Sequence, residues 1–337
     1  MRRLLIAVLL SVAVQYLPAQ EAATSTLHTS SRLVVVPALV QSTTKDVVYS
    51  LQANDFLLTD QGVTQKLSLD EAEKQPLSLV VLMQTGGAAA REFEKYRGLE
   101  TMLAEMLGGA PNQVSIVNFD SRPEAASPFT SDISQWADAI DAPDPGDSGA
   151  AIMDALKFGL NLLAKQPLNH RKVILLISQP QDSGSTTTAK EIAQITSETN
   201  AAIYSITFTP QATRLKGALK EPPHASRPVT VAQGTAGETH VIGFDFSEPL
   251  KMILDAMKTD VAAEVADVSG GEAMRFGDRN QLDEMLSTMS RHIHNRYMLS
   301  FTPSKPDLGF HAIRVSLVQH PELSVKARRG YWLSNPE

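Results

Sequence analysis

The chain has 337 residues, of which 43% are hydrophobic and 20% are charged, and its formal net charge is −7. This length allows about two domains of roughly 150 residues each, and the composition is that of a globular protein rather than a disordered one. The acidic balance argues against general nucleic-acid binding, which needs basic patches. Because the chain has no cysteine, it has neither a disulfide framework nor a thiolate metal site.

The first twenty residues differ from the rest of the chain. Arg2 and Arg3 precede an apolar run from Leu4 to Val14, and small residues follow. This order is typical of a secretory signal peptide, and the apolar run is shorter than the roughly 20 residues of a membrane span. We therefore predict a signal peptide at 1–20, with an uncleaved anchor as the alternative, and a linker at 21–31. The protein is expected to be secreted or periplasmic, with no stable membrane span after signal removal.

Residues 32–75 are predicted to be all β. The expected strands are rich in valine or leucine and are Arg32–Val40, Val47–Leu51, Phe56–Leu58 and Lys66–Leu69, the last two joined at the turn Asp60-Gln61-Gly62. A segment of about 45 residues buries too little surface to form a core alone. It therefore needs a partner elsewhere in the chain.

From residue 76 the pattern becomes an alternation of strands and helices. The run Leu77–Met83 has only one polar residue and is short for a helix, so it predicts a strand buried on both faces. The other expected strands are Gln113–Phe119, Lys172–Ser178, Ala202–Phe208 and Ala273–Phe276, and the expected helices are Glu92–Leu107, Ile133–Ala142, Ala151–Lys165, Thr188–Asn200, Glu248–Val268 and Gln281–His294. The alternation predicts a Rossmann-like, doubly wound α/β domain over 76–294, with a mostly parallel sheet and helices on both faces. Leu77–Met83, Lys172–Ser178 and Ala202–Phe208 should lie at its centre, and 209–247 should be a loop insertion.

The chain returns to β structure over 295–333. The expected strands are Arg296–Thr302, Gly309–Leu317 and Leu323–Arg328, followed by Gly330-Tyr331-Trp332. We predict that the two β segments share one small β domain, with the α/β domain inserted between them. Two separate β modules are the alternative.

Several stretches between about 32 and 333 carry a family resemblance. They include Arg-Leu-Val-Val-Val-Pro at 32–37, Asn54–Gln65, Leu79–Gly87, Gly149–Leu156, Arg171–Ser185 and Arg328–Trp332. In this order they resemble von Willebrand factor type A domain proteins, in particular the exported VWFA-related group of Acidobacteria. The resemblance implies a metal-ion-dependent adhesion site, in which Asp-x-Ser-x-Ser, a Thr and a distal Asp hold Mg²⁺ or Mn²⁺ and the partner's carboxylate completes the coordination.

The ligands of that site are replaced in this sequence. The five positions hold Gln84, Gly86, Ala88, Ala150 and Gln179, and a hard cation needs oxygen ligands with at least one carboxylate. We therefore expect a degenerate metal site with no metal ion and no other cofactor. Asp120 and Asp182, predicted on neighbouring loops, leave a rebuilt metal site as the least favoured alternative.

The resemblance implies an exported, non-enzymatic protein–protein interaction module of the adhesion type, and the replaced ligands predict that it does not depend on a metal ion. In doubly wound sheets ligands bind at the carboxyl ends of the strands, so the expected partner-binding rim is Gln84, Thr85, Gly86, Gly87, Ala88, Ala150 and Gln179. A structural or adapter subunit of a cell-envelope assembly is the alternative. An enzyme is not expected, because the chain has no Gly-x-Ser-x-Gly motif and no arranged Ser-His-Asp set. His292 and His294 are expected to contact the carbonyl dipole at a helix end.

Overall fold

Five parallel strands form the central sheet of the α/β domain. The computed structural model describes residues 33–70, 75–124, 127–141, 143–208, 247–257 and 259–334. In their order across the sheet the strands are β6 (Gln113–Phe119), β5 (Leu77–Gln84), β7 (Arg171–Ser178), β8 (Ala202–Phe208) and β9 (Ala273–Phe276). Every residue of β5, β7 and β8 is buried, as expected for strands covered on both faces. The predicted fold class and the central place of these three strands are confirmed.

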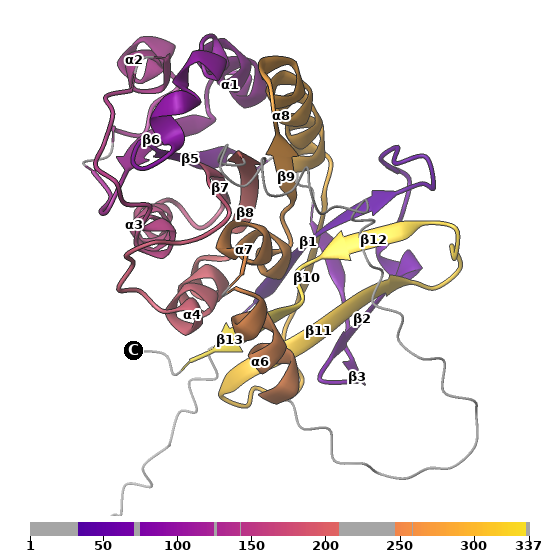
Figure 1. The fold of residues 1–337 in the computed structure, drawn as a ribbon. Helices are drawn as coiled ribbons and strands as arrows, with labels where there is room; N and C mark the ends of the chain where they lie inside the picture. Colours follow the sequence, from indigo (N-terminus) through magenta and orange to yellow (C-terminus); the bar gives the residue numbers. More distant parts are fainter. Residues whose placement is uncertain are drawn as a thin grey trace, which may run out of the picture. The chain divides into compact units, whose positions relative to one another are not determined.

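Helices cover both faces of this sheet (Figure 1). One face packs against α1 (Leu99–Leu107), α2 (Ala137–Asp141) and α8 (Arg279–His294). The other packs against α3 (Ile152–Ala164), α4 (Ala189–Thr199), α6 (Ser247–Ala256) and α7 (Val261–Ser269). Because successive strand residues point to opposite faces, Leu175 belongs to the first core and Ile174 to the second.

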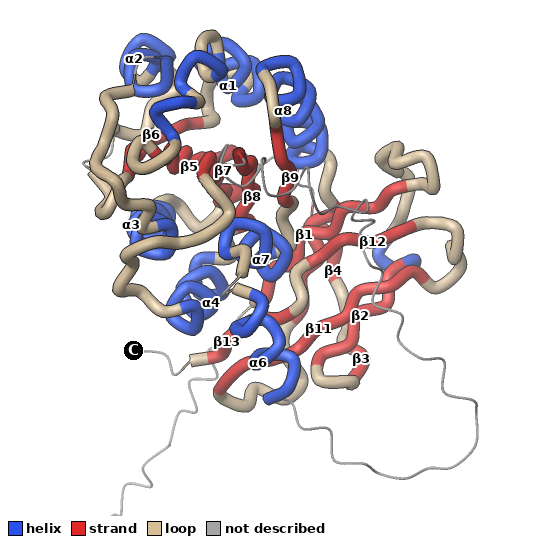
Figure 2. The backbone as a smooth tube through the Cα atoms, in the orientation of Figure 1, coloured by secondary structure: helices blue, strands red, loops and turns tan. Residues whose placement is uncertain are grey.

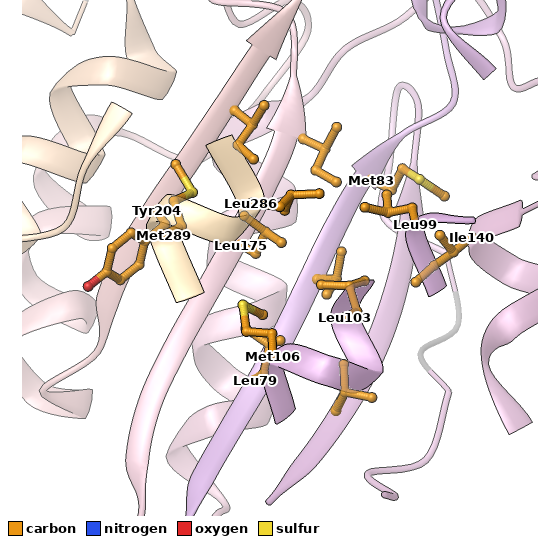
Figure 3. Packing of buried hydrophobic residues seen from close by; sticks show 14 of the residues in the cluster. Leu79, Met83, Leu99, Leu103, Met106, Ile140, Leu175, Tyr204, Leu286 and Met289 are labelled. Atoms are coloured by element: carbon orange, nitrogen blue, oxygen red, sulfur yellow. The ribbon is translucent and has the colours of Figure 1, made fainter. Parts of the chain in front are cut away.

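The core beneath α1 and α8 is shown in Figure 3. Leu79 and Leu175 of the sheet belong to one buried cluster with Leu103 of α1 and Leu286 of α8. Burial of each large apolar side chain contributes roughly 1.5–3 kcal/mol. These contacts anchor the strands whose ends carry the candidate site.

The two β segments interleave in a pair of antiparallel sheets (Figure 2). One sheet has the order β12 (Ser324–Ala327), β1 (Val34–Gln41), β10 (Tyr297–Phe301), β4 (Ser68–Asp70), and the other has the order β13 (Gly330–Leu333), β11 (Gly309–Leu317), β2 (Phe56–Asp60), β3 (Val63–Thr64). Val36 and Leu58 from the first segment share a core with Leu299 and Phe301 from the second. The predicted β domain, built from both ends of the chain, is confirmed.

Three predicted helices are interrupted. The helix expected over Glu92–Leu107 is a 3-10 turn at Phe93–Lys95 and then α1, because Gly98 between them has a φ of +79°, outside the helical region. The helix expected over Glu248–Val268 is α6 followed by α7. Asp260 separates them, since its carboxylate accepts a hydrogen bond from Ala263 N at 2.9 Å and caps the start of α7. The helix expected over Ile133–Ala142 is a 3-10 helix at Ile133–Gln135 followed by α2, because Trp136 between them has a φ of −137°, outside the helical region. The other 3-10 helices among the described residues are Ala53–Asp55 and Ala89–Arg91.

One predicted strand and one predicted strand pairing near the amino terminus are wrong. Val47–Leu51 is not a strand, and Val47 makes only a single bridge, with Gln41. Phe56–Leu58 and Lys66–Leu69 were expected to be joined at one turn, but β2 pairs with β3 whereas β4 pairs with β10. The reason is that Gln61 and Gly62 both have positive φ, 47° and 79°, which makes a two-residue hairpin whose return strand begins at once.

Some predictions fall outside the described residues. They are the signal peptide at 1–20, the linker at 21–31 and, apart from Ser247, the insertion at 209–247. The domain boundaries therefore stay predictions. In the described part of the chain, no helix is both long enough and apolar enough to cross a membrane.

Candidate functional site

A pair of glutamines joins the carboxyl ends of two neighbouring strands. Gln84 is the last residue of β5, and Gln179 directly follows β7, which pairs in parallel with β5. Gln179 N donates to Gln84 Oε1 at 2.8 Å, and Gln84 Nε2 donates to Gln179 Oε1 at 3.3 Å and to Gly86 O at 3.0 Å. The side chain of Gln84 is fully buried. Its amide therefore has partners on both its oxygen and its nitrogen without any ion.

Glycines allow the surrounding loops to pack backbone against backbone. A Cβ at Gly86 would lie 2.3 Å from Gly149 O and 2.7 Å from Asp120 Cβ, and one at Gly149 would lie 2.6 Å from Ser121 Cα. Real Cβ contacts are not this short, so a side chain at position 86 requires the loop at 149 to move. The loop after β5 is thus closed by the loops after β6 and before α3. We call this contact of three loops, together with the Gln84–Gln179 pair, the joint.

Thr85 and Ala150 also belong to this joint, and both form hydrogen bonds with main-chain groups of neighbouring segments. Thr85 Oγ1 donates to Phe119 O at 3.2 Å, and Gly146 N donates to Thr85 O at 3.1 Å. Ala150 and Ser183 exchange two main-chain hydrogen bonds, of 3.2 and 2.8 Å. These polar groups of Thr85 and Ala150 therefore have hydrogen-bond partners within the protein.

The structure brings the seven predicted rim positions together but leaves few of them accessible. Gln84, Thr85, Gly86 and Ala150 are buried, Ala88 and Gln179 are half-buried, and Gly87 is exposed. A molecule approaching this edge therefore meets only Gly87, Ala88 and Gln179 of the predicted set. The other four hold the loops in place.

Acidic side chains near the rim accept hydrogen bonds that hold the neighbouring loops together. Asp147 accepts hydrogen bonds from Ser121 Oγ at 2.5 Å and from Gly149 N at 2.7 Å, and the first of these lowers the pKa of the Asp147 carboxyl. Asp120 accepts from Asp147 N at 3.0 Å, and Asp182 accepts from Met153 N, at the start of α3, at 3.0 Å. Within the ranges that the structure describes, no group of three or more His, Asp or Glu side chains could hold a metal ion.

Two buried charge clusters were missed by the sequence reading. In the β domain, His311 Nδ1 lies 2.9 Å from Asp60 Oδ1, and Tyr331 donates to the same carboxylate at 2.7 Å. The period-2 pattern of β11 could have revealed His311, because it falls in phase with the buried Ile313.

The second cluster lies around Glu272. His292 Nδ1 is 2.6 Å from its carboxylate, so His292 pairs with a carboxylate instead of the helix-end carbonyls, whereas His294 Nδ1 does contact Ser290 O at 2.8 Å. Burial alone would raise the pKa of Glu272, but the hydrogen bond from His292 and the charges of Lys326 and Arg296 lower it to about 2.

Residues 79–184 match the family model of the von Willebrand factor type A domain. Among solved structures, the chain is similar to an aerotolerance-related membrane protein of Bacteroides fragilis, at 13% identity and a TM-score of 0.40, over 64% of this chain and 98% of that one. It is also similar to BatB of Bacteroides thetaiotaomicron, at 11% identity and a TM-score of 0.40, again over 64% and 98%.

A third similar structure is the von Willebrand factor domain of the type V pilus tip protein Mfa5 of Porphyromonas gingivalis, at 20% identity and a TM-score of 0.29, over 32% of this chain and 39% of that one. None of the curated proteins compared with the chain matches it. The family match and the helix-flanked parallel sheet support a von Willebrand factor type A domain.

Proposed function

We propose that this protein is an exported, non-enzymatic protein-binding module of the adhesion type, whose rim works without a metal ion. The observation that carries the proposal is the closed joint at Gln84, Gly86 and Gln179. The resemblance places a charged, cation-holding centre at these positions, and here a neutral amide bridge occupies them. We further propose that the chain is one of the exported VWFA-related proteins of Acidobacteria, located in the periplasm or outside the cell.

The chemistry of the joint supports metal independence. Mg²⁺ needs oxygen ligands that include a carboxylate and gives up its water reluctantly. Gln84 offers one amide oxygen, which already accepts a hydrogen bond from Gln179 N at 2.8 Å. Gly86 has no space for a hydroxyl side chain, and Ala150 has no ligand atom. The nearby carboxylates of Asp120 and Asp182 already brace main-chain groups.

The proposed partner surface is the accessible part of the rim. Gly87, Ala88 and Gln179 lie there with the exposed loop residues Asp147 and Gln181. Interfaces of this small, polar kind rely on shape and hydrogen bonds rather than on bulk hydrophobicity. A protein partner that places donors against Asp147 and the Gln179 amide would fit it.

A structural or adapter subunit is the second candidate, and one observation favours it. Arg328, which follows β12, is 3% exposed and donates to Asn200 Oδ1 at 3.3 Å and to Val35 O at 3.2 Å. This buried guanidinium ties the end of α4 to the β domain. A rigid junction of that kind suits a spacer that holds two other components at a set distance.

The deciding experiment captures partners from an envelope extract of the source cells with the tagged mature protein, with and without EDTA. We expect the same partner in both conditions. Ala88→Arg should remove it, because a long cation would block the half-buried rim, whereas the matched change Ala164→Arg on the exposed end of α3 should not. Loss of capture in EDTA would contradict metal independence. If Leu57→Arg, on the exposed face of β2, abolishes capture while Ala88→Arg does not, the adapter function is supported instead.

A further inference from the structure

A cavity lies at the amino edge of the parallel sheet, opposite the rim. Its volume is about 210 Å³, and it is bounded by the first residues of β7 and β8 and by one face of the sheet that contains β1 and β10. Val35 of β1 and Met298 of β10 line it, whereas their neighbours Val34 and Leu299 point the other way into the core of the β domain. Alternation along β1 and β10 thus gives the cavity an apolar wall.

Three basic side chains line the same cavity, and each is at least nine-tenths buried. Arg171 and Lys172 are 9% exposed and Arg296 is 5% exposed. Arg171 donates to Ile293 O at 2.9 Å and to Gln75 O at 3.3 Å, so carbonyl oxygens hold its guanidinium. Two groups of Arg296 donate to Gly270 O and to the Glu272 carboxylate.

Two donors of the wall have no hydrogen-bond partner among the described residues. The Lys172 ammonium makes no hydrogen bond and no ion pair with any residue that the structure describes. Burial lowers the pKa of this lysine, and no hydrogen bond or opposite charge counteracts the effect. Arg296 Nε is also buried and lacks an acceptor among the described residues. A buried donor without an acceptor is costly and is normally satisfied in native proteins.

The acidic and histidine side chains around the cavity do not supply that partner. Glu198 Oε1 accepts from Ser334 Oγ at 2.7 Å and from Gln194 Nε2 at 3.3 Å. Asp70 lines the cavity but forms no ion pair with Lys172. His170 has its Nδ1 on Ser78 Oγ, at 2.8 Å. Among the described residues that line the cavity, the three basic side chains outnumber the two acidic ones, Asp70 and Glu198.

We propose that this cavity binds a small amphiphilic anion, namely a carboxylate on a short aliphatic body, with Lys172 Nζ as the anchor and Arg296 Nε as the second donor. The apolar wall of Val35 and Met298 receives the aliphatic part. At 210 Å³ the space is smaller than the roughly 300–1,000 Å³ of ordinary ligand pockets. It holds roughly seven water-sized groups at about 30 Å³ each, which matches a chain of about six carbons. This site is independent of the proposed rim.

Calorimetric titration of the mature protein tests the proposal. Hexanoate should bind, hexanamide should bind at least about tenfold more weakly because it lacks the charge, and inorganic phosphate should bind more weakly because it lacks the apolar body. Hexanamide or phosphate binding as tightly as hexanoate would overturn the assignment, and so would an absence of hexanoate binding at millimolar concentration.

Matched variants locate the site. Lys172→Met should weaken hexanoate binding at least about tenfold, and Lys172→Arg should keep most of it, whereas Lys165→Met, on the exposed end of α3, should change nothing. Ala202→Leu adds bulk to the cavity wall and should lower affinity while every charge remains. It provides the test if Lys172→Met fails to fold. Unchanged affinity in Ala202→Leu, or in a folded Lys172→Met, would show that hexanoate binds elsewhere.

Discussion

The charges at the carboxyl and amino edges of the parallel sheet are the reverse of what the family resemblance leads one to expect. At the carboxyl edge, where the family resemblance leads one to expect a cation and its carboxylates, Gln84 and Gln179 form a neutral and fully paired amide bridge. At the amino edge, the buried Lys172 has no partner among the described residues. Topology alone points to the carboxyl edge. Unsatisfied groups point to the other edge as well, and they are the more direct sign of a missing ligand.

The largest effect should come from a buried cation that does have partners. His311 is 1% exposed, with Nδ1 2.9 Å from the Asp60 carboxylate and Nε2 2.7 Å from the Asp307 carbonyl. A carbonyl oxygen can only accept, and the carboxylate also accepts from Tyr331, so both ring nitrogens must donate and the ring is an imidazolium. His311→Leu should cost about 3–5 kcal/mol in urea unfolding, because it leaves Asp60 buried and unpaired.

The pH dependence of the same pair has a definite sign. Burial alone would lower the pKa of His311, but the hydrogen bonds to Asp60 and Asp307 raise it above its ordinary value of 6.5. A raised pKa contributes stability that is complete below pH 6.5 and is lost as pH rises through the folded value. Unfolding free energies should show this loss in the wild type and in His320→Leu, but not in His311→Leu. A pH profile shared by all three proteins would refute the charged state.

Restoring a serine of the family pattern at the rim should be the next largest effect. In Gly86→Ser the new Cβ would meet Gly149 O at 2.3 Å, and overpacking of this kind costs about 1–3 kcal/mol. Ala88→Ser restores the other serine at a half-buried position and should stay within about 0.5 kcal/mol of the wild type. Urea unfolding measures both. Equal stability of the two variants would mean that the joint is looser than the glycine contacts indicate.

The sequence was sufficient for the fold class and for placing the seven rim positions near one another. Apolar runs such as Leu77–Met83 are too short and too β-branched for anything but buried strands, and the glycines after them predict a turn. The break at Gly98 was missed because apolar periodicity continues through it, and only its positive φ of 79° ends the helix. Apolar periodicity shows which face of a segment is buried, but it does not show whether the helix runs through the segment without a break.

The chemistry of the site was less predictable than its location. The identities of Gln84 and Gln179 suggested a lost metal site, but their mutual hydrogen bonds depend on a register between β5 and β7 that local sequence does not specify. Lys172 was predicted to be the first residue of a strand, but the strand begins one residue earlier, at Arg171. Lys172 lies in a cavity wall together with Val35 and Met298 of the β domain, and such a contact between distant segments has no local signal.

After Gly86→Ser, the next largest effect is expected at the amino edge. There a substitution should raise the free energy of unfolding instead of lowering it. Lys172→Met removes a cation on a mostly buried side chain that has no partner among the described residues, and it keeps most of the side chain's volume. Burial disfavours the charged form of a lysine. We expect a gain of about 1 kcal/mol in urea unfolding without added ligand, against a change within about 0.5 kcal/mol for Lys165→Met. A loss above 1 kcal/mol would indicate that the described chain already satisfies the ammonium.

The smallest expected effect is that of metal ions on the rim. A ligand that binds only the folded state adds about 2.7 kcal/mol at a concentration one hundred times its dissociation constant, so a working site would raise the melting temperature at millimolar Mg²⁺ or Mn²⁺. We expect no rise beyond that produced by Na⁺ at the same ionic strength, since Gln84 is already paired with Gln179. Gln84→Asp should not create the response, because Gly86, Ala150 and Gln179 still supply no anionic ligand. A saturating rise with Mn²⁺ in the wild type that disappears in Gln84→Ala would show a functioning metal centre, and the contrast between the two edges would then fail.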